Sequence, residues 1–545
     1  MPLAQEIIHR VAVLENNRSQ WENLFEDIRD YIYPITASFT SANPGDRAID
    51  RNRKIFDPTA ERAHSDLVGA LMGGLTNSSI EWFQYSTLDP AMMDKLTNRR
   101  PLERATKLVH SIFKNPESAF YSALHEWYFE ITGLGTAHLF KRGKGTKSTF
   151  ETIPLAEMLF EENHLGQIDT AYHCTYMTPK QLMDQFPEMD EDLMRNLENA
   201  GKDPNVTNKY KMIHCIKPRK NRDKTKIDAK NKAYMSVYIL EGFGQHVLEE
   251  SGFDRFPVYS ARWEKIAGRE VYGRSPAMKS LKDAKVLNQM VKTNLEAGEQ
   301  IVMPALQGPY NAYVGKIKLM PRFINFYKMT MGISDPTLKP INVVGNLPVG
   351  LEMEQQRRQA IKESFFIDLL QEDKRARMTQ LESAQSTQDR LMKMAPQTLR
   401  IQTEALTRLV TDLFDEIKEE GLLDDLPEEI QDVQIVYNSP LVQAQKQSQV
   451  SDITGFANLL AQFAQVFPDL LLVPKPLPFA QKIATVFGID AKDLNSEEEI
   501  NAEKERQREV AANEAAAKQT RDLAAAGKDL AAIQSQGVDP ASLFA

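Results

Sequence analysis

The stretch EVYGRSPAMKSLKDAKVLNQMVKTN, residues 270–294, is a turn that leads without a break into a long helical pattern. Ser275 can cap the helix through its hydroxyl, and Pro276 suits the first helical position, where an N–H has no partner within the helix. The apolar residues gather within roughly 120° of a helical wheel; they are Ala277, Leu281, Ala284, Leu287, Val291 and Leu295. The lysines occupy the opposite side; they are Lys279, Lys282, Lys285 and Lys292. The spacing predicts a helix from residue 276 to about 300, roughly 37 Å long.

A basic insert follows this helix, and a second helix follows the insert. Residues 301–350 hold so many glycines and prolines that a long helix is excluded, and short strands at 316–320 and 322–327 are favoured. The insert carries five Lys or Arg residues against Asp335 alone. A further apolar-periodic run, from Leu351 to about Glu372, predicts a second helix of roughly 33 Å. Two helices of similar length therefore bracket the insert.

Outside the two long helices, the spacing of apolar residues changes from helical to strand-like near residue 133 and back to helical later in the chain. Apolar spacing predicts helices at residues 1–32, 58–75, 98–113 and 119–132. β-branched and aromatic runs predict a mainly antiparallel β module between residues 133 and 258, with strands at 137–141, 150–154, 168–177, 210–216 and 233–240 and a short helix at 179–186. A later helix, kinked at Pro396 and capped by Gly421, is expected to reach Glu420, and a strand at 433–437 is expected to complete the β module. The fold class is α+β, predominantly helical.

The end of the chain differs in composition from the rest. From residue 441 we expect helices with proline-rich joints. The part from Ser496 onward is rich in Ala, Glu, Lys and Gln and has few large apolar residues. Such a helix gains little by packing on its own chain, so we expect it to be exposed or assembled with copies of itself.

Composition bounds the class of protein. A chain of 545 residues is too long for one core. Its net charge of −9 argues against a broad grip on nucleic-acid phosphate, so any such contact must be local. Two cysteines, Cys174 and Cys215, form no disulfide framework and favour a reducing compartment. The most apolar window, Leu459–Phe479, is interrupted by prolines and polar residues, and the N-terminus lacks a signal-peptide pattern. We therefore expect a soluble protein that is intracellular at synthesis.

Three patterns resemble catalytic or ligand-binding motifs at first sight. In each case the residues and their spacing favour a structural interpretation. FKRGKGTKSTF, Phe140–Phe150, lacks the spacing of a nucleotide-binding loop, so a solvated hairpin turn is predicted. The pairs His173–Cys174 and His214–Cys215 lie in predicted strands, where adjacent side chains point to opposite faces and cannot share one zinc ion. Carboxylate clusters occur in loops or at helix starts, where the helix dipole stabilises them; they lie at 188–192, 424–429 and 497–499. We predict no enzyme, no cofactor and no metal site.

Basic clusters remain after these exclusions. The segment KPRKNRDKTKIDAKNK, Lys217–Lys232, holds eight basic residues against two acidic ones. A solvated hairpin or flexible loop is the favoured interpretation of it. A smaller group, Lys374, Arg375 and Arg377, lies beside the second long helix, and the basic insert lies between the two helices.

From about Arg10 to Leu426 the chain resembles the portal proteins, the head-to-tail connectors of tailed phages, and in particular those of short-tailed phages. IFDPTAERAHSDLVGALMGGLTNSSIEWFQYS (Ile55–Ser86) is similar to the family's D-x-T stretch, helix and Gly-Leu-Thr turn. YGRSPAMKSLKDAKVLN (Tyr272–Asn288) matches its Tyr-Gly-x-Ser/Gly-Pro helix start. MTQLESAQSTQDRLMKMAPQTLRIQTEALTRLVTDLFDEIKEEGLL (Met378–Leu423) resembles its Met-Thr-Ala-Thr-Glu-x-x-x-Arg run, from which Gln380 and Ser383 depart.

The resemblance implies a portal fold, a ring that is dodecameric in the virion and surrounds a DNA channel. The wing holds N-terminal helices and the β module, the stem two helices, the clip a small α/β insert, and the crown or C-terminal barrel is helical. The implied divisions are wing 1–275, first stem helix 276–300, clip 301–350, second stem helix 351–372, tunnel-loop region 373–385, wing return 386–440, and crown with C-terminal tail 441–545.

The implied function is that of a structural portal at one capsid vertex, through which the genome is packaged and ejected. The implied partners are copies of the chain, the large terminase, a tail adaptor, the major capsid and scaffolding proteins, and double-stranded DNA bound without sequence preference; no membrane is involved. The implied location is the virion, after assembly in the host cytoplasm. DNA-channel candidates are Lys374, Arg375 and Arg377 at the tunnel constriction, and the stem lysines Lys279, Lys282, Lys285 and Lys292. The stem lysines are expected either to face the channel or to pair with acids on a neighbouring subunit. Clip candidates for the terminase or adaptor are Lys316, Lys318, Arg322 and Lys328. Two alternatives stay open: another virion component, such as an internal ejection or scaffolding protein, and a nucleotide-driven enzyme.

Overall fold

Two antiparallel sheets lie at the centre of the larger of two compact units in this computed structural model. The structure describes residues 2–34, 55–93, 95–201, 209–223, 225–226, 228–242, 247–266, 270–303, 306–307, 326, 339–340, 347–367, 394–427, 430, 433–438, 455, 493–495 and 497–535. The larger unit comprises residues 1–82 and 108–422, and the smaller comprises residues 83–107 and 423–545.

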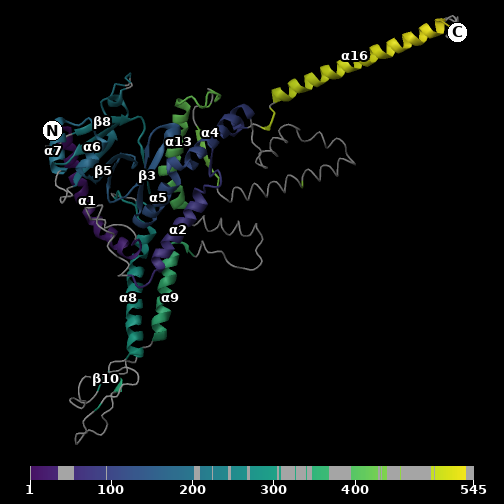
Figure 1. Cartoon of the computed structure of the whole chain (residues 1–545). Helices are drawn as coiled ribbons and strands as arrows, with labels where there is room; N and C mark the ends of the chain where they lie inside the picture. The colour runs from purple at the N-terminus through teal and green to yellow at the C-terminus, as the bar shows by residue number, and fades with distance from the viewer. Residues whose placement is uncertain are drawn as a thin grey trace. The chain divides into compact units, whose positions relative to one another are not determined.

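The larger sheet has five strands in the order β4-β5-β6-β7-β8. Its strands are β4 (Met158–Glu162), β5 (Ile168–Met177), β6 (Tyr210–Pro218), β7 (Tyr234–Leu240) and β8 (Val247–Phe253). Helix α1 (Leu3–Tyr31) covers one face, burying Ala4, Ile7 and Val11 against it. Two helices, α6 (Pro179–Gln185) and α7 (Glu191–Gly201), share a second apolar cluster with β6 and β7. The sheet therefore packs against α1, which precedes it in the sequence, and against α6 and α7, which lie between β5 and β6 (Figure 1).

The smaller sheet has three strands, β3 (Thr149–Ile153), β2 (Thr136–Arg142) and β9 (Val258–Arg262), in that order. Helix α5 (Phe120–Leu134) leads directly into β2, and Gly135 ends the helix with φ of +87°. Such a positive φ suits glycine, because a Cβ atom strains it. The predicted β module is confirmed as antiparallel, but it is two sheets rather than one. Strands β4, β8 and β9 were not predicted; β8 contains Glu-Glu-Ser-Gly, in which Glu and Gly have low β-propensity.

Two long helices lie side by side and extend away from the sheets (Figure 1). They are α8 (Pro276–Val302) and α9 (Leu347–Ser364). Helix α8 confirms the prediction from the opening stretch. Helix α9 starts before the predicted Leu351 and ends before the predicted Glu372, because Phe366 adopts φ of +60°, outside the helical region. Between them the structure describes only Met303, Phe326 and a short pair, β10 (Leu306–Gln307) and β11 (Lys339–Pro340), so the predicted strands at 316–320 and 322–327 lie, apart from Phe326, outside the described residues.

The remaining helices of the larger unit are α2 (Thr59–Leu75) and a continuous run of α12 (Ala395–Ile401), a π-helical turn (Gln402–Leu406) and α13 (Thr407–Glu419). Pro396 was predicted to kink this run, and that prediction is wrong. Pro396 lies in the first turn of α12, where its missing N–H costs nothing, and the irregularity is the π turn instead. Gly421 follows the helix with φ of +75°, as predicted for its cap.

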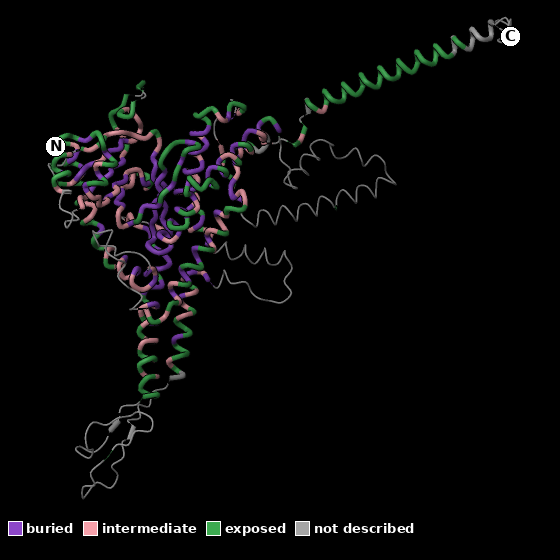
Figure 2. The backbone as a smooth tube through the Cα atoms, viewed as in Figure 1, coloured by how far each residue is buried: buried purple, intermediate pink, exposed green. Residues whose placement is uncertain are grey.

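The smaller unit contains a two-stranded antiparallel sheet of β1 (Phe83–Thr87) and β12 (Val433–Tyr437). The prediction that residues 433–437 complete the β module is therefore wrong, because the partner strand β1 was not recognised. Helix α3 (Pro90–Met93) follows β1, and α4 (Leu96–Lys114) runs from this unit into the larger one. Helix α16 (Glu497–Ser535) is 39 residues long, and its described side chains are almost all exposed (Figure 2).

Candidate functional site

The start of α8 is fixed by a single buried serine. The Ser275 hydroxyl accepts a hydrogen bond from the Met278 N–H at 3.0 Å, which caps the helix, and donates one to the Gly133 carbonyl at 2.7 Å. Its side chain is fully buried. Because one hydroxyl serves both contacts, the beginning of α8 and the end of α5 are joined at one atom.

Two glycines let the backbones at this junction touch. A Cβ atom on Gly135 would lie 2.2 Å from the carbonyl oxygen of Gly273, and one on Gly273 would lie 2.2 Å from the carbonyl oxygen of Gly135. The Gly273 N–H also donates to the Thr136 hydroxyl at 2.9 Å. No side chain fits at either glycine without backbone movement. The turn in the opening stretch is thus a docking point on the C-terminus of α5.

A cluster of polar groups joins α8, α9 and Asp57, which lies just before α2. Asn294 donates to Glu354 at 2.6 Å, and Arg358 pairs with both Glu354 and Asp57 at 2.9 Å. Glu354 is only 3% exposed although it lies on a helix that projects from the sheets. Burial acts to raise the pKa of Asp57, but hydrogen bonds from Thr59 and Arg358 outweigh it and lower that pKa. We call the contacts of Asn294, Glu354, Arg358 and Asp57 the polar seam.

The apolar stripe of α8 is buried only in its first half. Ala277, Leu281, Ala284 and Leu287 are buried, whereas Leu295 is 54% exposed. Other large apolar side chains are exposed at the same end of the helix pair (Figure 2); they are Ile301, Val302, Met303, Val349, Leu351 and Met353. The far end of the pair therefore leaves apolar surface uncovered within one chain.

Three of the four α8 lysines form ion pairs within their own chain. Lys279 pairs with Glu264, Lys285 with Asp27 at 2.7 Å, and Lys292 with Glu296 at 4.0 Å. Lys282 is exposed and forms no ion pair with any residue that the structure describes. Lys282 is thus the lysine of this set for which the structure describes no acidic partner.

The other predicted site residues lie outside the described residues. They are the channel candidates Lys374, Arg375 and Arg377 and the clip candidates Lys316, Lys318, Arg322 and Lys328. Their assignments stay predictions.

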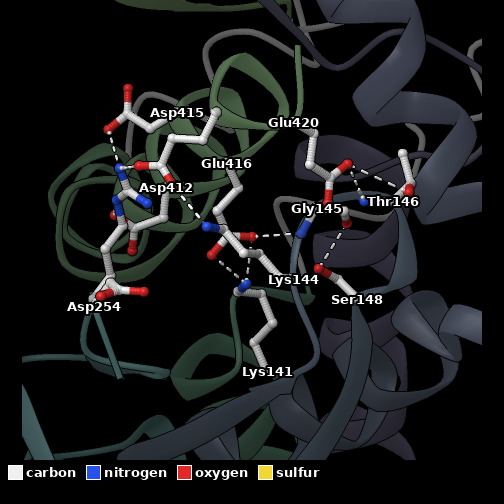
Figure 3. A network of polar contacts seen from close by, with 12 residues as sticks. Lys141, Lys144, Gly145, Thr146, Ser148, Asp254, Asp412, Asp415, Glu416 and Glu420 are labelled. Atoms are coloured by element: carbon white, nitrogen blue, oxygen red, sulfur yellow. Dashed lines mark hydrogen bonds and ion pairs between the residues drawn. The ribbon is translucent and has the colours of Figure 1, made fainter. Parts of the chain in front are cut away.

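The hairpin at Phe140–Phe150 is anchored by the acidic side of α13 (Figure 3). Lys141 donates to both carboxylate oxygens of Glu416 at 2.7 Å, and the Gly145 N–H donates to the same carboxylate at 2.8 Å. Glu420 accepts from Thr146, and Glu419 pairs with Lys144 at 2.7 Å. The predicted turn is confirmed, but it is not solvated throughout, since Lys141, Gly145 and Glu416 are buried. The carboxylates of Glu416 and Glu420 already accept the hydrogen bonds of the N–H donors that a bound phosphate would need.

A second cluster surrounds the π turn. Glu404, within that turn, accepts from the backbone N–H of Arg262 at 3.0 Å and from its guanidinium. Arg262 is 2% exposed and also binds Glu162 and the Gly166 carbonyl. Neither cluster was predicted from the sequence. The acidic residues of α13 at three- and four-residue spacing were a signal that this helix faces basic groups; they are Asp412, Asp415, Glu416 and Glu419.

The His-Cys pairs divide between the two faces of the larger sheet, as predicted. His173 lies opposite His214 in the register of β5 and β6, whereas both cysteines face α1. Burial lowers the pKa of His214 to about 3, and its ring hydrogen-bonds Ser236 at 2.9 Å. Burial raises the pKa of each cysteine to about 12. Within the described part of the chain, no group of three His, Cys, Asp or Glu residues has metal-binding geometry.

The carboxylate clusters behave as structural features where they are described. Glu191 and Asp192 occupy the first turn of α7, and Glu497 begins α16, as the helix-start interpretation predicted. Among the helices that the structure describes, none is long and apolar enough to cross a membrane.

Comparison with known proteins matches this architecture to a family. The family model described as bacteriophage head to tail connecting protein matches residues 4–494. The chain is 27% identical to the portal protein of Salmonella phage epsilon15, over 99% of this chain and 97% of that one. It is 26% identical to the probable portal protein of Bordetella phage BPP-1, over 89% and 87% of the two chains. A solved neck structure of an empty gene transfer agent particle covers 78% of this chain and 94% of its own, at 11% identity and a TM-score of 0.32.

The described residues form a mixed helical and antiparallel-sheet fold with a projecting helix pair. The chain belongs to the family of bacteriophage head to tail connecting proteins. The resemblance to portal proteins that the sequence motifs carried is thereby confirmed.

Proposed function

We propose that this chain is the portal subunit of a phage and assembles into a ring at one vertex of the capsid, through which the genome is packaged and ejected. The observation that carries the proposal is the helix pair α8–α9. It projects from the sheets, it is joined internally by the polar seam, and its far end leaves large apolar side chains exposed. Such a pair is incompletely covered in a single chain, and copies arranged side by side around an axis would cover it.

In this assignment α8 and α9 are the stem helices, and the insert between them is the clip. The clip would dock the large terminase during packaging and the tail adaptor afterwards, using Lys316, Lys318, Arg322 and Lys328. The sheets and their helices would form the wing, toward the capsid and scaffolding proteins. The relatives' names, portal protein and probable portal protein, support this division of roles, as does their coverage of nearly the whole chain. By analogy with the family we propose a dodecamer in the virion.

DNA would pass through the ring without sequence-specific contacts. A net charge of −9 keeps the binding of phosphate weak overall, so that DNA can slide. We propose that Lys282, which has no ion-pair partner among the described residues, and the group Lys374, Arg375 and Arg377 supply local attraction. Lys279, Lys285 and Lys292 contribute less, because each has an acidic partner in its own chain.

The proposed role is assembly rather than catalysis. The hairpin that most resembles a phosphate loop has its amides turned toward Glu416 and Glu420, which argues against the nucleotide-driven enzyme. An internal ejection or scaffolding protein is the second candidate, favoured by the long exposed helix α16. Assembly of the chain in the host cytoplasm is part of the same proposal.

Electron microscopy of the purified chain in negative stain tests the proposal. We expect rings with a central hole, and we expect Leu351→Glu to abolish them, because it places a charge in the exposed apolar end of the helix pair. Leu165→Glu is the matched control, since Leu165 is 69% exposed but lies in the β4–β5 turn. Monomers or filaments from the unaltered chain would overturn the proposal, and rings that survive Leu351→Glu would overturn the role of the helix pair.

A further inference from the structure

The connection between β6 and β7 is a folded loop with a defined base. The Arg219 N–H donates to the Ala233 carbonyl at 2.9 Å, and the Asp223 N–H donates to the Asn231 side-chain oxygen at 3.2 Å. Nearer the tip, the Lys226 N–H donates to the Asp223 carbonyl at 3.3 Å. These contacts define the path of the described part of the loop, which joins the antiparallel strands β6 and β7 as the solvated-hairpin interpretation of this segment predicted.

Strand β8 holds the loop in place. A Cβ atom on Gly252 would lie 2.5 Å from the Ala229 carbonyl oxygen, so the loop backbone rests directly on a position that has no side chain. Arg219 pairs with Glu250 at 3.0 Å, and Lys232 pairs with Asp254 at 3.4 Å. The two cations at the base of the loop are thus used for anchoring.

The cations nearer the tip have no ion-pair partner in the part of the chain that the structure describes. Lys220, Arg222, Lys226 and Lys230 are all exposed, and none forms an ion pair with a residue that the structure describes. In a chain of net charge −9, four unpaired cations within eleven residues are a concentrated positive site. We call these four residues the basic tip.

We propose that the basic tip binds the phosphate backbone of double-stranded DNA, at a site separate from the helix pair. Protein partners are usually anchored by buried aromatic or large apolar residues, and residues 217–232 contain no aromatic residue and only one large apolar residue, Ile227. Phosphate contacts need only cations and polar groups, and the tip supplies cations in its Lys and Arg side chains. The choice of double-stranded DNA as the ligand rests on the proposed portal function. The binding of phosphate by the four cations does not require that the chain forms a ring.

The contact is expected to be independent of base sequence and strongly dependent on salt. Each neutralised phosphate contributes about −0.9 to the slope of log K against log salt concentration. Four contacts therefore weaken binding about 100-fold between roughly 50 and 200 mM salt.

Fluorescence anisotropy with a short labelled DNA duplex and the full chain tests the site. The variant Lys220→Gln/Arg222→Gln/Lys226→Gln/Lys230→Gln should bind at least about tenfold more weakly at low salt, and its slope should be shallower by about 3 to 4. The matched control is Lys114→Gln/Lys147→Gln/Lys180→Gln/Lys418→Gln. It removes the same charge from exposed lysines that form no ion pair with described residues, and it should bind nearly as the unaltered chain does.

A charge-neutral variant separates the shape of the loop from its charge. Gly252→Ala keeps every cation but places a methyl group against the loop backbone, so it should weaken binding while the salt slope stays steeper than that of the fourfold variant. Circular dichroism of each variant should show the unaltered fold.

Three results would overturn the proposal. They are unchanged binding by the fourfold basic-tip variant, an equal loss in the matched control, and unchanged DNA binding together with lost binding to poly-glutamate, which would assign the tip to an acidic protein. Rings are scored by microscopy and not by this assay, so failure here is distinguishable from failure of the portal proposal.

Discussion

At the scale of single residues, the junction between α5 and α8 depends on Ser275. Its hydroxyl is the only described side-chain group that bonds both the α8 amide of Met278 and the α5 carbonyl of Gly133. Capping of a helix by Ser was predictable from the Ser-Pro pattern. The second bond was not, because it joins residues 142 positions apart in the chain.

Ser275→Ala should lower the free energy of unfolding by about 1 to 3 kcal/mol, since it removes the cap and leaves a buried carbonyl without its donor. Urea unfolding followed by circular dichroism measures the change. Ser111→Ala is a suitable control, because that hydroxyl bonds only within its own helix and is exposed, so its loss should cost less than about 0.5 kcal/mol. Equal effects of the two changes would contradict the dual role of Ser275.

The buried pair of Lys141 and Glu416 gives a second prediction at this scale. Lys141→Met should destabilise the larger unit by about 3 to 5 kcal/mol, because Glu416 is left as a buried charge with too few donors. Lys141→Met/Glu416→Leu should recover part of that loss, since it removes both charges. Urea titrations of the two single variants and the double variant form the cycle. If the double variant were as unstable as the sum of the single ones, the two side chains would not be coupled.

At the scale of elements, α1 is attached to the five-stranded sheet by apolar contacts and by ion pairs along its edge. Arg10 donates two hydrogen bonds to Glu161, at 2.7 and 2.8 Å, and Lys211 pairs with Glu15 at 2.8 Å. The bonds from Arg10 outweigh burial and lower the pKa of Glu161 below its ordinary value of 4.5. The attachment of this helix should therefore depend on pH.

A carboxyl with a lowered pKa stabilises the folded chain above pH 4.5, and this stabilisation is lost as the pH falls through the folded value. Glu161→Gln should cost at most about 1 kcal/mol at neutral pH, because the pair is partly exposed, and the cost should shrink below pH 4.5. Urea unfolding across a pH series measures it. Glu151→Gln, in an exposed pair with Arg142, should cost less at every pH. A cost that is constant with pH would refute the role of the Glu161 charge.

Elements with a strong period were predicted well, and those defined by distant partners were not. The α8 helix is confirmed because its cap and apolar stripe are local in the sequence. Strand β12 was assigned to the wrong sheet, since strand pairing depends on a second strand that may lie anywhere in the chain, here β1 some 350 residues earlier by number. The clusters around Arg262 and Glu416 were missed for the same reason, because the partners of each residue lie far from it in the sequence.

At the scale of the whole molecule, the described parts of the two units differ in how completely they bury their helices. The larger unit covers its sheets with α1 and with α6 and α7, whereas α16 has exposed side chains over most of its length. The tail from Ser496 was predicted to be exposed or assembled with copies of itself. Its exposure is confirmed for the described side chains of α16. Assembly with copies stays a prediction.

Ending the chain after Ala502 should leave its thermal stability nearly unchanged, because the described α16 side chains beyond that residue are exposed and add little buried surface. Differential scanning calorimetry should show a shift of less than about 2 °C in the main transition. A fall of more than about 5 °C would mean that the tail packs on the chain or on a second copy. Repeating the scan at several protein concentrations distinguishes these two cases.

The contact between Gly135 and Gly273 has a consequence for the divergence of this protein. The atoms nearest each glycine belong to the backbone of the other, so a smaller side chain at one position cannot make room for a larger one at the other. Neither a single substitution at one glycine nor a pair of substitutions at both is therefore expected to be neutral. We expect related genes to keep both glycines after the surrounding sequence has become unrecognisable, so that the pair marks the lineage better than any longer motif.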